Sequence, residues 1–376
     1  MNDATPATNG GTMGGRPTMK NRLAAFRLMS ELSRAPRAPE GFSFGALPSP
    51  WDPRDYRYSN LVPAAQDLPV RFSLRRNLPP PWNQGRLGTC ACASTCWGPQ
   101  AYDEIGQGDF PAEGLSTAFL YVEAKKRDGI PDVAGTYLRV VMEVLNKVGV
   151  CPERTMPYST LTRDTAPFPQ PSPEAYTQAE KYRIQAYAAI CTFDDTARDA
   201  DRIIREIKTA IMREGPVAVA VIVHRSMLYP RPPDYKILVP PDDSYLGAHA
   251  MCFDGWDDAY GAFDCRNTWG PDWGNGGYCR VPYEWVTARR SYGWCLFEVW
   301  TTVDMVIPRP ANQVVIWPNR KTALVDGVEI GLDQPAVVTE QNRMLAPVRF
   351  LAGNLGYLVA WDEQRQAAVL TRPQAQ

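Results

Sequence analysis

Histidine is the scarcest reactive residue in this chain: its 376 residues include only His224 and His249. Nine cysteines are present, but those around Cys90 are not spaced as zinc-ligand pairs, and histidine ligands are too few to complete a four-donor site. We therefore expect no metal and no other cofactor. A reaction that needs an imidazole base must use one of the two histidines.

The sequence also lacks an excess of charge and any long apolar run. Its net charge is −1, which gives no electrostatic reason to bind nucleic acid. No run approaches the roughly 18 apolar residues that a membrane helix needs, so no membrane span is expected. The first residues are polar and do not resemble a cleavable signal peptide, which leaves the localisation open between the cytoplasm and export without such a signal.

The small residues that follow Cys90 predict a tightly buried helix over residues 90–105. A thiol at the first turn of a helix meets unpaired N–H groups and the positive end of the helix dipole, which favour the reactive thiolate. The amide of Gln84 and the Cys90 N–H can together donate to a developing oxyanion. We expect Cys90 to be a nucleophile rather than a buried structural thiol, and Gln84 an oxyanion donor rather than a loop cap.

A second stretch supplies the base that such a nucleophile needs. His249 lies in an apolar run, and a turn-rich break at residues 256–261 separates it from a second run that ends at Asn267. A β-hairpin centred near residue 258 would place His249 and Asn267 opposite each other on one face. The Asn267 oxygen could then accept from the imidazole, and Trp269 could shield that bond from water.

Other residues near these motifs are expected to be structural. His224 follows the buried strand predicted at residues 217–223 and is expected to be a structural or surface histidine, although it is the only alternative base. The hairpin register would place Cys252 and Cys265 on opposite faces, so we expect no disulfide between them.

Residues 68–300 resemble the papain family of cysteine peptidases. The stretch from Gln84 to Cys90 is similar to that family's Gln-x-x-x-Gly-Ser-Cys motif, and residues 266–278 are similar to its Asn-Ser-Trp-Gly…Trp-Gly…Gly-Tyr signature. The resemblance implies an α+β fold of two lobes, one helical and one an antiparallel β-barrel-like sheet. It also implies a peptide hydrolase with these site residues: catalytic Cys90, His249, Asn267 and Gln84, and substrate-binding Gly135, Thr136 and Trp269.

Three positions depart from that family pattern. Leu87 stands where the family has the cysteine of its common disulfide, so that bridge cannot form. Ala91 replaces the usual tryptophan after the nucleophile, and Ala248 precedes the histidine where many members have aspartate. None of the three removes a catalytic atom.

The predicted domains run as follows: a disordered basic tail (1–45) with one short helix, an extended lead-in (46–72), the peptidase domain (73–305), a stiff linker (306–311) and a small α+β domain (312–373). There is no room for a long helical pro-domain, so we do not expect inhibition by one. The last domain resembles the copper amine oxidase N-terminal module of bacterial surface proteins. Residues 305–376 contain no histidine or cysteine, so copper binding is not expected.

The expected partner is a peptide or protein substrate, with a protein or cell-wall partner for the last domain. Two alternatives stay open at this point. The same triad could pass the acyl group to an amine, as a transpeptidase does. Alternatively, the peptidase domain could be silent in a delivered or scaffolding protein, although the complete set of catalytic residue types argues against this.

Overall fold

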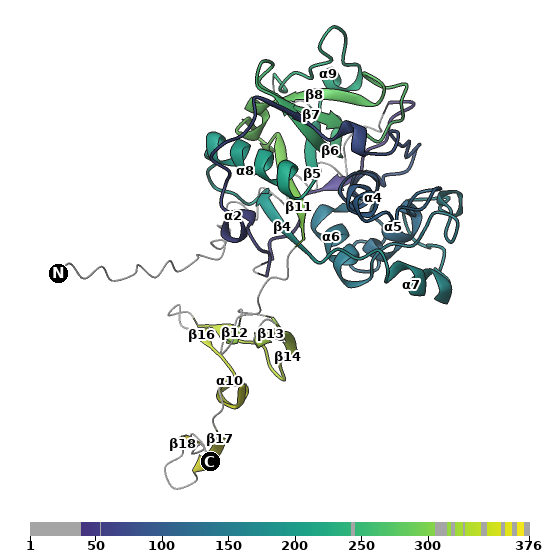
Figure 1. The fold of residues 1–376 in the computed structure, drawn as a ribbon. Coiled ribbons are helices and arrows are strands. Elements are labelled where there is room, and N and C mark those ends of the chain that lie inside the picture. The colour runs from purple at the N-terminus through teal and green to yellow at the C-terminus, as the bar shows by residue number, and fades with distance from the viewer. Residues whose placement is uncertain are drawn as a thin grey trace, which may run out of the picture. The chain divides into compact units, whose positions relative to one another are not determined.

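The structure is a computed structural model that describes residues 39–52, 54–241 and 245–304, together with 314–316, 320–325, 328–339, 344–354, 358–362 and 367–371. The chain divides into two compact units, Met1–Met305 and Val306–Gln376 (Figure 1). The expected short helix near residues 19–33, the linker 306–311 and most of the expected tail lie outside the described residues. No helix in the described part of the chain is long and apolar enough to span a membrane.

The larger unit is built on a seven-stranded antiparallel sheet in the order β4-β11-β5-β6-β7-β8, with β2 paired to β6. Every residue of β5 (Val217–Val223) is buried, because this strand of small and β-branched residues lies between two others. The remaining strands are β2 (Arg71–Ser73), β4 (Ala186–Cys191), β6 (Gly247–Asp257), β7 (Ala262–Arg266), β8 (Tyr278–Pro282) and β11 (Leu296–Val303). The predicted strand at residues 217–223 is confirmed.

The central helix consists of α3 (Cys90–Thr95), a wider π-type turn η2 (Cys96–Gln100) and α4 (Ala101–Gln107). The π-type turn contains Pro99, which has no N–H for the regular ladder. All residues of α3 are buried, and the helix packs against β6. It ends where Gly108 takes a positive φ of 81°, so both the predicted helix and its glycine stop are confirmed.

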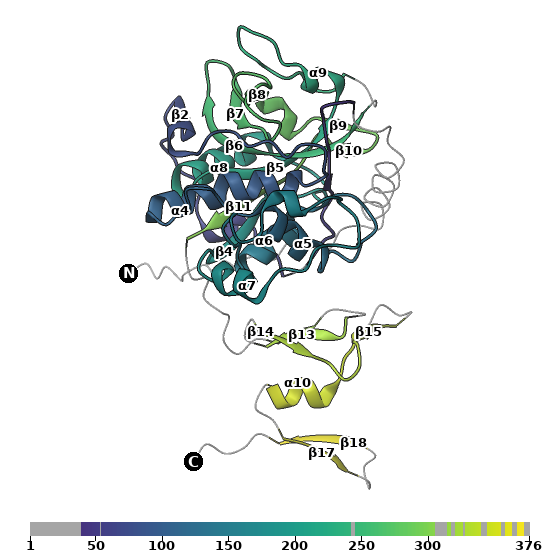
Figure 2. The ribbon, with the colours of Figure 1, turned by 90° about the vertical axis from the view of Figure 1, so that its right-hand side faces the viewer.

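The other helices begin and end largely where the sequence predicts. Ser116 caps α5 (Thr117–Lys125) by accepting from the Phe119 N–H. Helix α6 (Leu138–Lys147) ends before Gly149, and α8 covers the predicted Ala200–Arg213. In Figures 1 and 2, helices α5, α6 and α7 (Pro173–Ala179) lie together, apart from strands β7 and β8. This is the predicted two-lobed α+β fold.

The predicted hairpin is present, but its register differs. Cys252 lies opposite Arg266 and Phe253 opposite Cys265, and a bulge follows between Phe253 and Gly255. The turn is therefore centred beyond residue 258, and His249 lies diagonally from Asn267 rather than directly opposite it. The two residues still share a face, because the shift is an even number of positions. Cys252 and Cys265 project to opposite faces and are free thiols.

The lead-in segment crosses the larger unit before the central helix. Strand β1 (Ala46–Leu47) pairs in parallel with β3 (Thr136–Tyr137), and α2 (Tyr58–Leu61) follows. Residues 39–45, expected in the disordered tail, are described and lie against the same domain. The prediction of disorder is wrong for these residues, because their contacts are with groups more than 40 positions away that local composition does not reveal.

Short elements complete the larger unit: η1 (Arg75–Asn77), η3 (Tyr158–Thr160), α9 (Arg225–Leu228), η4 (Tyr283–Val286), β9 (Arg289–Arg290) and β10 (Gly293–Trp294). The described residues of the smaller unit form a three-stranded sheet, two strand pairs and one helix. Its elements are β12 (Val314–Ile316), β13 (Thr322–Val325), β14 (Val328–Gly331), β15 (Val337–Val338), β16 (Met344–Leu345), α10 (Val348–Asn354), β17 (Leu358–Asp362) and β18 (Ala367–Thr371).

Candidate active site

Cys90 is the first residue of α3, and its side chain is completely buried. Burial raises the pKa of this thiol to about 12, against the opposing effect of nearby backbone N–H groups, those of Ala250 and Gly45 among them. The Ala250 N–H belongs to the residue that follows His249 on β6, so the sulfur lies beside the strand that carries the imidazole. In the described state the thiol is protonated at neutral pH.

The imidazole of His249 is oriented by two neighbours. Its Nε2 lies 2.7 Å from the Asn267 Oδ1, and its ring stacks on Trp269 with centroids 4.4 Å apart. Because an amide oxygen only accepts, Nε2 carries the proton and Nδ1 has the free lone pair. Burial lowers the pKa of His249 to about 4, although the bond to Asn267 acts in the opposite direction. The ring is neutral in this state.

The amide of Gln84 is fixed next to these groups. Its Oε1 accepts from the Thr268 hydroxyl at 2.5 Å, and its Nε2 donates to the Leu87 carbonyl at 2.9 Å. One Nε2 hydrogen therefore remains for another acceptor. Thr268 also donates its N–H to the Asn267 Oδ1 at 2.8 Å, so a single residue orients both the expected oxyanion donor and the expected triad amide.

Sequence reasoning did not identify Thr268 or Tyr158 as supporting residues. The Tyr158 hydroxyl donates to the Gln84 carbonyl at 2.7 Å and lies 2.8 Å from the Thr89 hydroxyl. The sequence does offer a signal for Thr268, because its hydroxyl lies between two residues of the predicted site, Asn267 and Trp269. Nothing local in the sequence connects Tyr158 with residues 84–89.

The structure brings the remaining predicted residues to the same region, except His224. Gly135 has a φ of 90°, and the Thr136 N–H donates to the Gly45 carbonyl. His224 instead caps α9, where its Nδ1 accepts from the Ser226 N–H. Among the described residues, no three His, Cys, Asp or Glu side chains are grouped to hold a metal ion.

Residues 42–49, which we call the strap, lie across this site. The Gly45 N–H donates to the Ala248 carbonyl at 3.0 Å, and the Gly45 carbonyl accepts from the Thr136 N–H at 2.9 Å. Contact is so close that a Cβ on Gly45 would lie 2.1 Å from the Gly88 carbonyl oxygen. Only glycine fits at this point of the strap, directly beside the nucleophile loop.

The first part of the strap packs on aromatic rings at one side of the nucleophile. Phe42 meets Trp269 edge-on at 4.9 Å and Tyr229 at 5.5 Å. The Trp269 Nε1 donates to the Ser43 carbonyl at 3.2 Å, while the Ser43 hydroxyl donates to the Gly85 carbonyl at 2.8 Å. The strap is therefore held by both main-chain and side-chain contacts.

The last part of the strap is anchored on a buried carboxyl. The Ser49 hydroxyl donates to the Glu298 Oε2 at 2.7 Å, and the Ser49 N–H donates to Oε1. Trp300 on β11 donates its Nε1 to Oε2 at 3.0 Å. Glu298 is fully buried, and burial raises its pKa to about 7 against these three hydrogen bonds.

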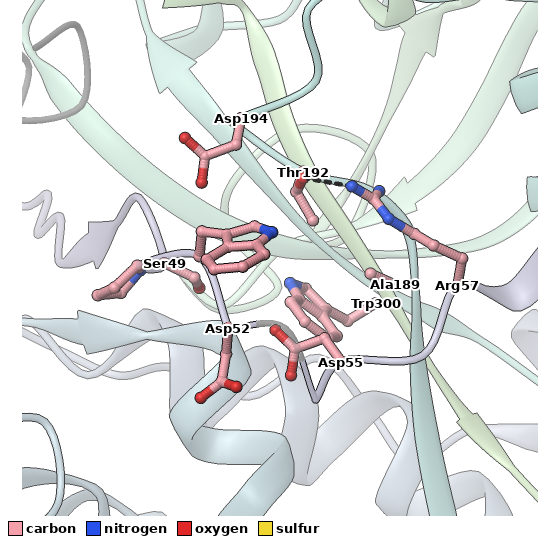
Figure 3. A pocket seen from close by; sticks show the side chains of 10 residues that line it. Ser49, Asp52, Asp55, Arg57, Ala189, Thr192, Asp194 and Trp300 are labelled. Carbon is pink, nitrogen blue, oxygen red and sulfur yellow. Dashed lines mark hydrogen bonds between the residues drawn. The ribbon is translucent and has the colours of Figure 1, made fainter. Parts of the chain in front are cut away.

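Beyond the strap, the chain forms one wall of a pocket whose other wall comes from β4 and β11 (Figure 3). Arg139 contacts both Asp52 (2.9 Å) and Asp55 (2.8 Å) in this segment. Burial opposes ionisation of Asp52, but Arg54 and Arg139 prevail and lower its pKa. Burial of Asp55 prevails over Arg139 and raises its pKa to about 7. These contacts with Arg139 hold the chain segment that follows the strap.

Comparison with known proteins gives two family matches. Residues 77–291 match the papain family of cysteine proteases, and residues 300–370 match the copper amine oxidase N-terminal domain. A peptidase C1-like protein of Acanthamoeba polyphaga mimivirus is 30% identical over 222 residues, covering 58% of this chain and 69% of the relative.

Two solved structures support the fold. Xylellain, a cysteine protease from Xylella fastidiosa, has a TM-score of 0.58 at 25% identity, covering 72% of this chain and 99% of xylellain. Digestive procathepsin L 3 from larval midgut of Tenebrio molitor has a TM-score of 0.51 at 15% identity, covering 76% of this chain and 92% of the other. This second likeness concerns the fold alone.

Proposed function

Because the chain belongs to the papain family of cysteine peptidases, we propose that it hydrolyses peptide bonds through Cys90, His249 and Asn267, with Gln84 in the oxyanion hole. The observation that carries this proposal is the bond between His249 Nε2 and Asn267 Oδ1. Because Nε2 is bonded to Asn267, Nδ1 of His249 is the ring nitrogen that can exchange a proton with Cys90.

In this mechanism His249 Nδ1 takes the proton of Cys90, and the thiolate attacks the peptide carbonyl carbon. The carbonyl oxygen becomes an oxyanion, which accepts from the Cys90 N–H and the remaining Gln84 Nε2 hydrogen. The imidazolium gives its proton to the leaving amine, and a thioester remains. His249 then removes a proton from water, whose oxygen attacks the thioester and releases the acid and the thiol.

The strap explains why the described state would be closed to substrate. It covers the buried Cys90, and its Gly45 carbonyl accepts from the Thr136 N–H. A cleavable carbonyl would instead have to reach the Cys90 N–H and Gln84. We therefore infer that the strap occupies the active site without being cleaved, and that the enzyme acts when the strap moves away.

The test uses the full chain and a peptide epoxysuccinyl inhibitor, with adducts located by intact mass and peptide sequencing. Gly45→Val places a side chain against Gly88 and should expel the strap. We expect rapid labelling of Cys90 in this variant, slow labelling of the wild type, and no labelling after a further His249→Ala change. An adduct on another cysteine, or equal labelling with and without His249, would overturn the assignment.

We further propose that the copper amine oxidase N-terminal domain serves as a protein- or wall-binding spacer rather than a copper site. In support, residues 306–376 form a compact unit of their own and contain neither histidine nor cysteine. Full-length Cys90→Ala protein should pellet with purified bacterial cell wall. If it stays in the supernatant, wall binding is ruled out and only a protein partner is left.

A further inference from the structure

We propose that Tyr121, Lys125, Asp128 and Asp164, here called the groove bracket, position the substrate-binding edge at Gly135 and Thr136 relative to the nucleophile. None of the four is among the residues proposed for catalysis. The inference rests on the proposed function, because it assumes that substrate uses this edge and reacts with Cys90. It assigns a positioning role to residues that the catalytic motifs do not include.

The first part of the bracket is a buried ion pair. Lys125, the last residue of α5, and Asp128 both have side chains with 0% exposure, and their charged atoms are 2.8 Å apart. The Lys125 Nζ also donates to the carbonyls of Ile130 (2.7 Å), Val133 (2.9 Å) and Gly135 (3.0 Å). A buried ammonium ion is tolerated only with such partners, so loop 128–136 is folded around this single nitrogen.

The carboxylate of Asp128 continues the bracket to the groove itself. Its Oδ1 accepts from the Ile130 N–H at 2.9 Å, and its Oδ2 accepts from the Thr136 hydroxyl at 3.0 Å. Asp128 thus holds the Thr136 side chain in place, while the Thr136 N–H donates to the Gly45 carbonyl of the strap. A substrate would find that N–H already oriented.

The second part of the bracket joins this edge to the nucleophile loop. The buried Tyr121 hydroxyl accepts from the Gly135 N–H at 3.0 Å and donates to the Asp164 carbonyl at 2.7 Å. The Asp164 Oδ2 accepts from the Gly88 N–H at 2.8 Å, two residues before Cys90. A chain of three hydrogen bonds therefore runs from the edge that binds substrate to the loop that carries the thiol.

The edge at Gly135 and Thr136 needs a non-covalent connection to the nucleophile loop, because no disulfide joins them. Leu87 occupies the position of the cysteine in the family's common disulfide, and all nine cysteines are free thiols. Displacement of a positioning group by about 1 Å is enough to slow a reaction by two orders of magnitude. The bracket supplies the fixed spacing between groove edge and nucleophile through buried ionic and hydrogen bonds.

The experiment separates binding at the groove from reactivity of the thiol. In full-length Gly45→Val protein we would add Tyr121→Phe, which keeps the ring and removes the hydroxyl between Gly135 and Asp164. The matched control is Tyr176→Phe, which also loses hydroxyl contacts, but to Lys126 and Glu123. KM and kcat are measured with a fluorogenic peptide, and the rate of alkylation with iodoacetamide, which needs no groove.

We expect Tyr121→Phe to raise KM by about tenfold, with alkylation within about twofold of the Gly45→Val parent. Tyr176→Phe should leave all three constants unchanged. Thr136→Val, which removes only the hydroxyl bonded to Asp128, should raise KM in the same way if Tyr121→Phe does not fold. The proposal is overturned if KM stays at the parent value in whichever variant folds, or if alkylation falls as much as peptide turnover. Failure of the Gly45→Val parent itself to react at Cys90 would instead overturn the proposed function.

Discussion

At the scale of single residues, the state of Cys90 and His249 follows from their burial. The strap excludes water, so the thiol pKa is raised to about 12 and the imidazole pKa is lowered to about 4. Between these values both groups are neutral, whereas catalysis uses thiolate and imidazolium. Removal of the strap restores hydration, which should lower the first pKa and raise the second.

This gives a prediction for pH dependence. At neutral pH, Gly45→Val protein should react with iodoacetamide at Cys90 at least about tenfold faster than wild type, because each unit of pKa lowering raises the thiolate fraction tenfold. The wild-type rate should rise only at strongly alkaline pH. The pH–rate profiles of the two proteins check this, with Cys90→Ala as the control for other thiols. Superimposable profiles would contradict it.

Thr268 carries a second prediction at this scale. Thr268→Val removes the hydroxyl that holds the Gln84 Oε1 but leaves the N–H bond to Asn267. In the Gly45→Val protein we expect kcat to fall about tenfold with little change in KM, because oxyanion stabilisation is needed mainly in the transition state. Steady-state kinetics measure this. An unchanged kcat would show that Gln84 keeps its orientation without Thr268.

Asp254 gives a third prediction, which concerns the stability of the fold. Both carboxyl oxygens are buried without a hydrogen-bond partner, and burial raises the pKa to about 7. The folded chain then binds this proton more tightly than the unfolded chain, so the contribution of Asp254 to stability is present below about pH 4 and is lost as the pH rises to about 7. Asp254→Asn should therefore stabilise the protein by about 4 kcal/mol at pH 8 and have little effect at pH 4. Denaturant unfolding at both pH values tests the sign.

At the scale of elements, the accuracy of sequence reasoning depended on how local the determining contacts are. The helix that Ser116 caps and the helix that ends before Gly149 were predicted because cap and stop lie within a few residues of the helix. The hairpin register was missed because the strands pair up to Asp257 and Ala262, which centres the turn beyond residue 258, and the apolar pattern does not mark that position. The strap was missed because Phe42 meets its partner Trp269 only in the folded domain.

The strap as an element gives a fourth prediction. Phe42→Ala removes two edge-on aromatic contacts, each of about 0.5–1.5 kcal/mol, and should increase the open population about tenfold. Epoxysuccinyl labelling of Cys90 should accelerate accordingly, though less than in Gly45→Val protein. Val70→Ala, at an exposed position of the same segment outside the strap, is the control. Equal labelling rates for wild type and Phe42→Ala would show that the aromatic contacts do not hold the strap.

At the scale of the whole molecule, the strap and the site belong to one chain, and this connection keeps the strap at a high effective concentration. Intact chain should therefore show the same latent activity per mole at every dilution. Residues 63–70 lie between the strap and β2, and several of them are exposed, so a recognition site for a specific protease can replace residues 63–67. Cutting there makes the strap a separate peptide that is held only by its contacts.

Activity of the cut Phe42→Ala protein should rise with dilution as the peptide dissociates, and added strap peptide should reverse the rise. The uncut protein at the same concentrations is the control. If activity per mole stays constant after complete cutting, the strap does not exchange on the time scale of catalysis. Closure would then depend on the whole 39–62 segment, through Tyr58 buried in the domain and the ion pairs of Arg139, rather than on residues 42–49 alone.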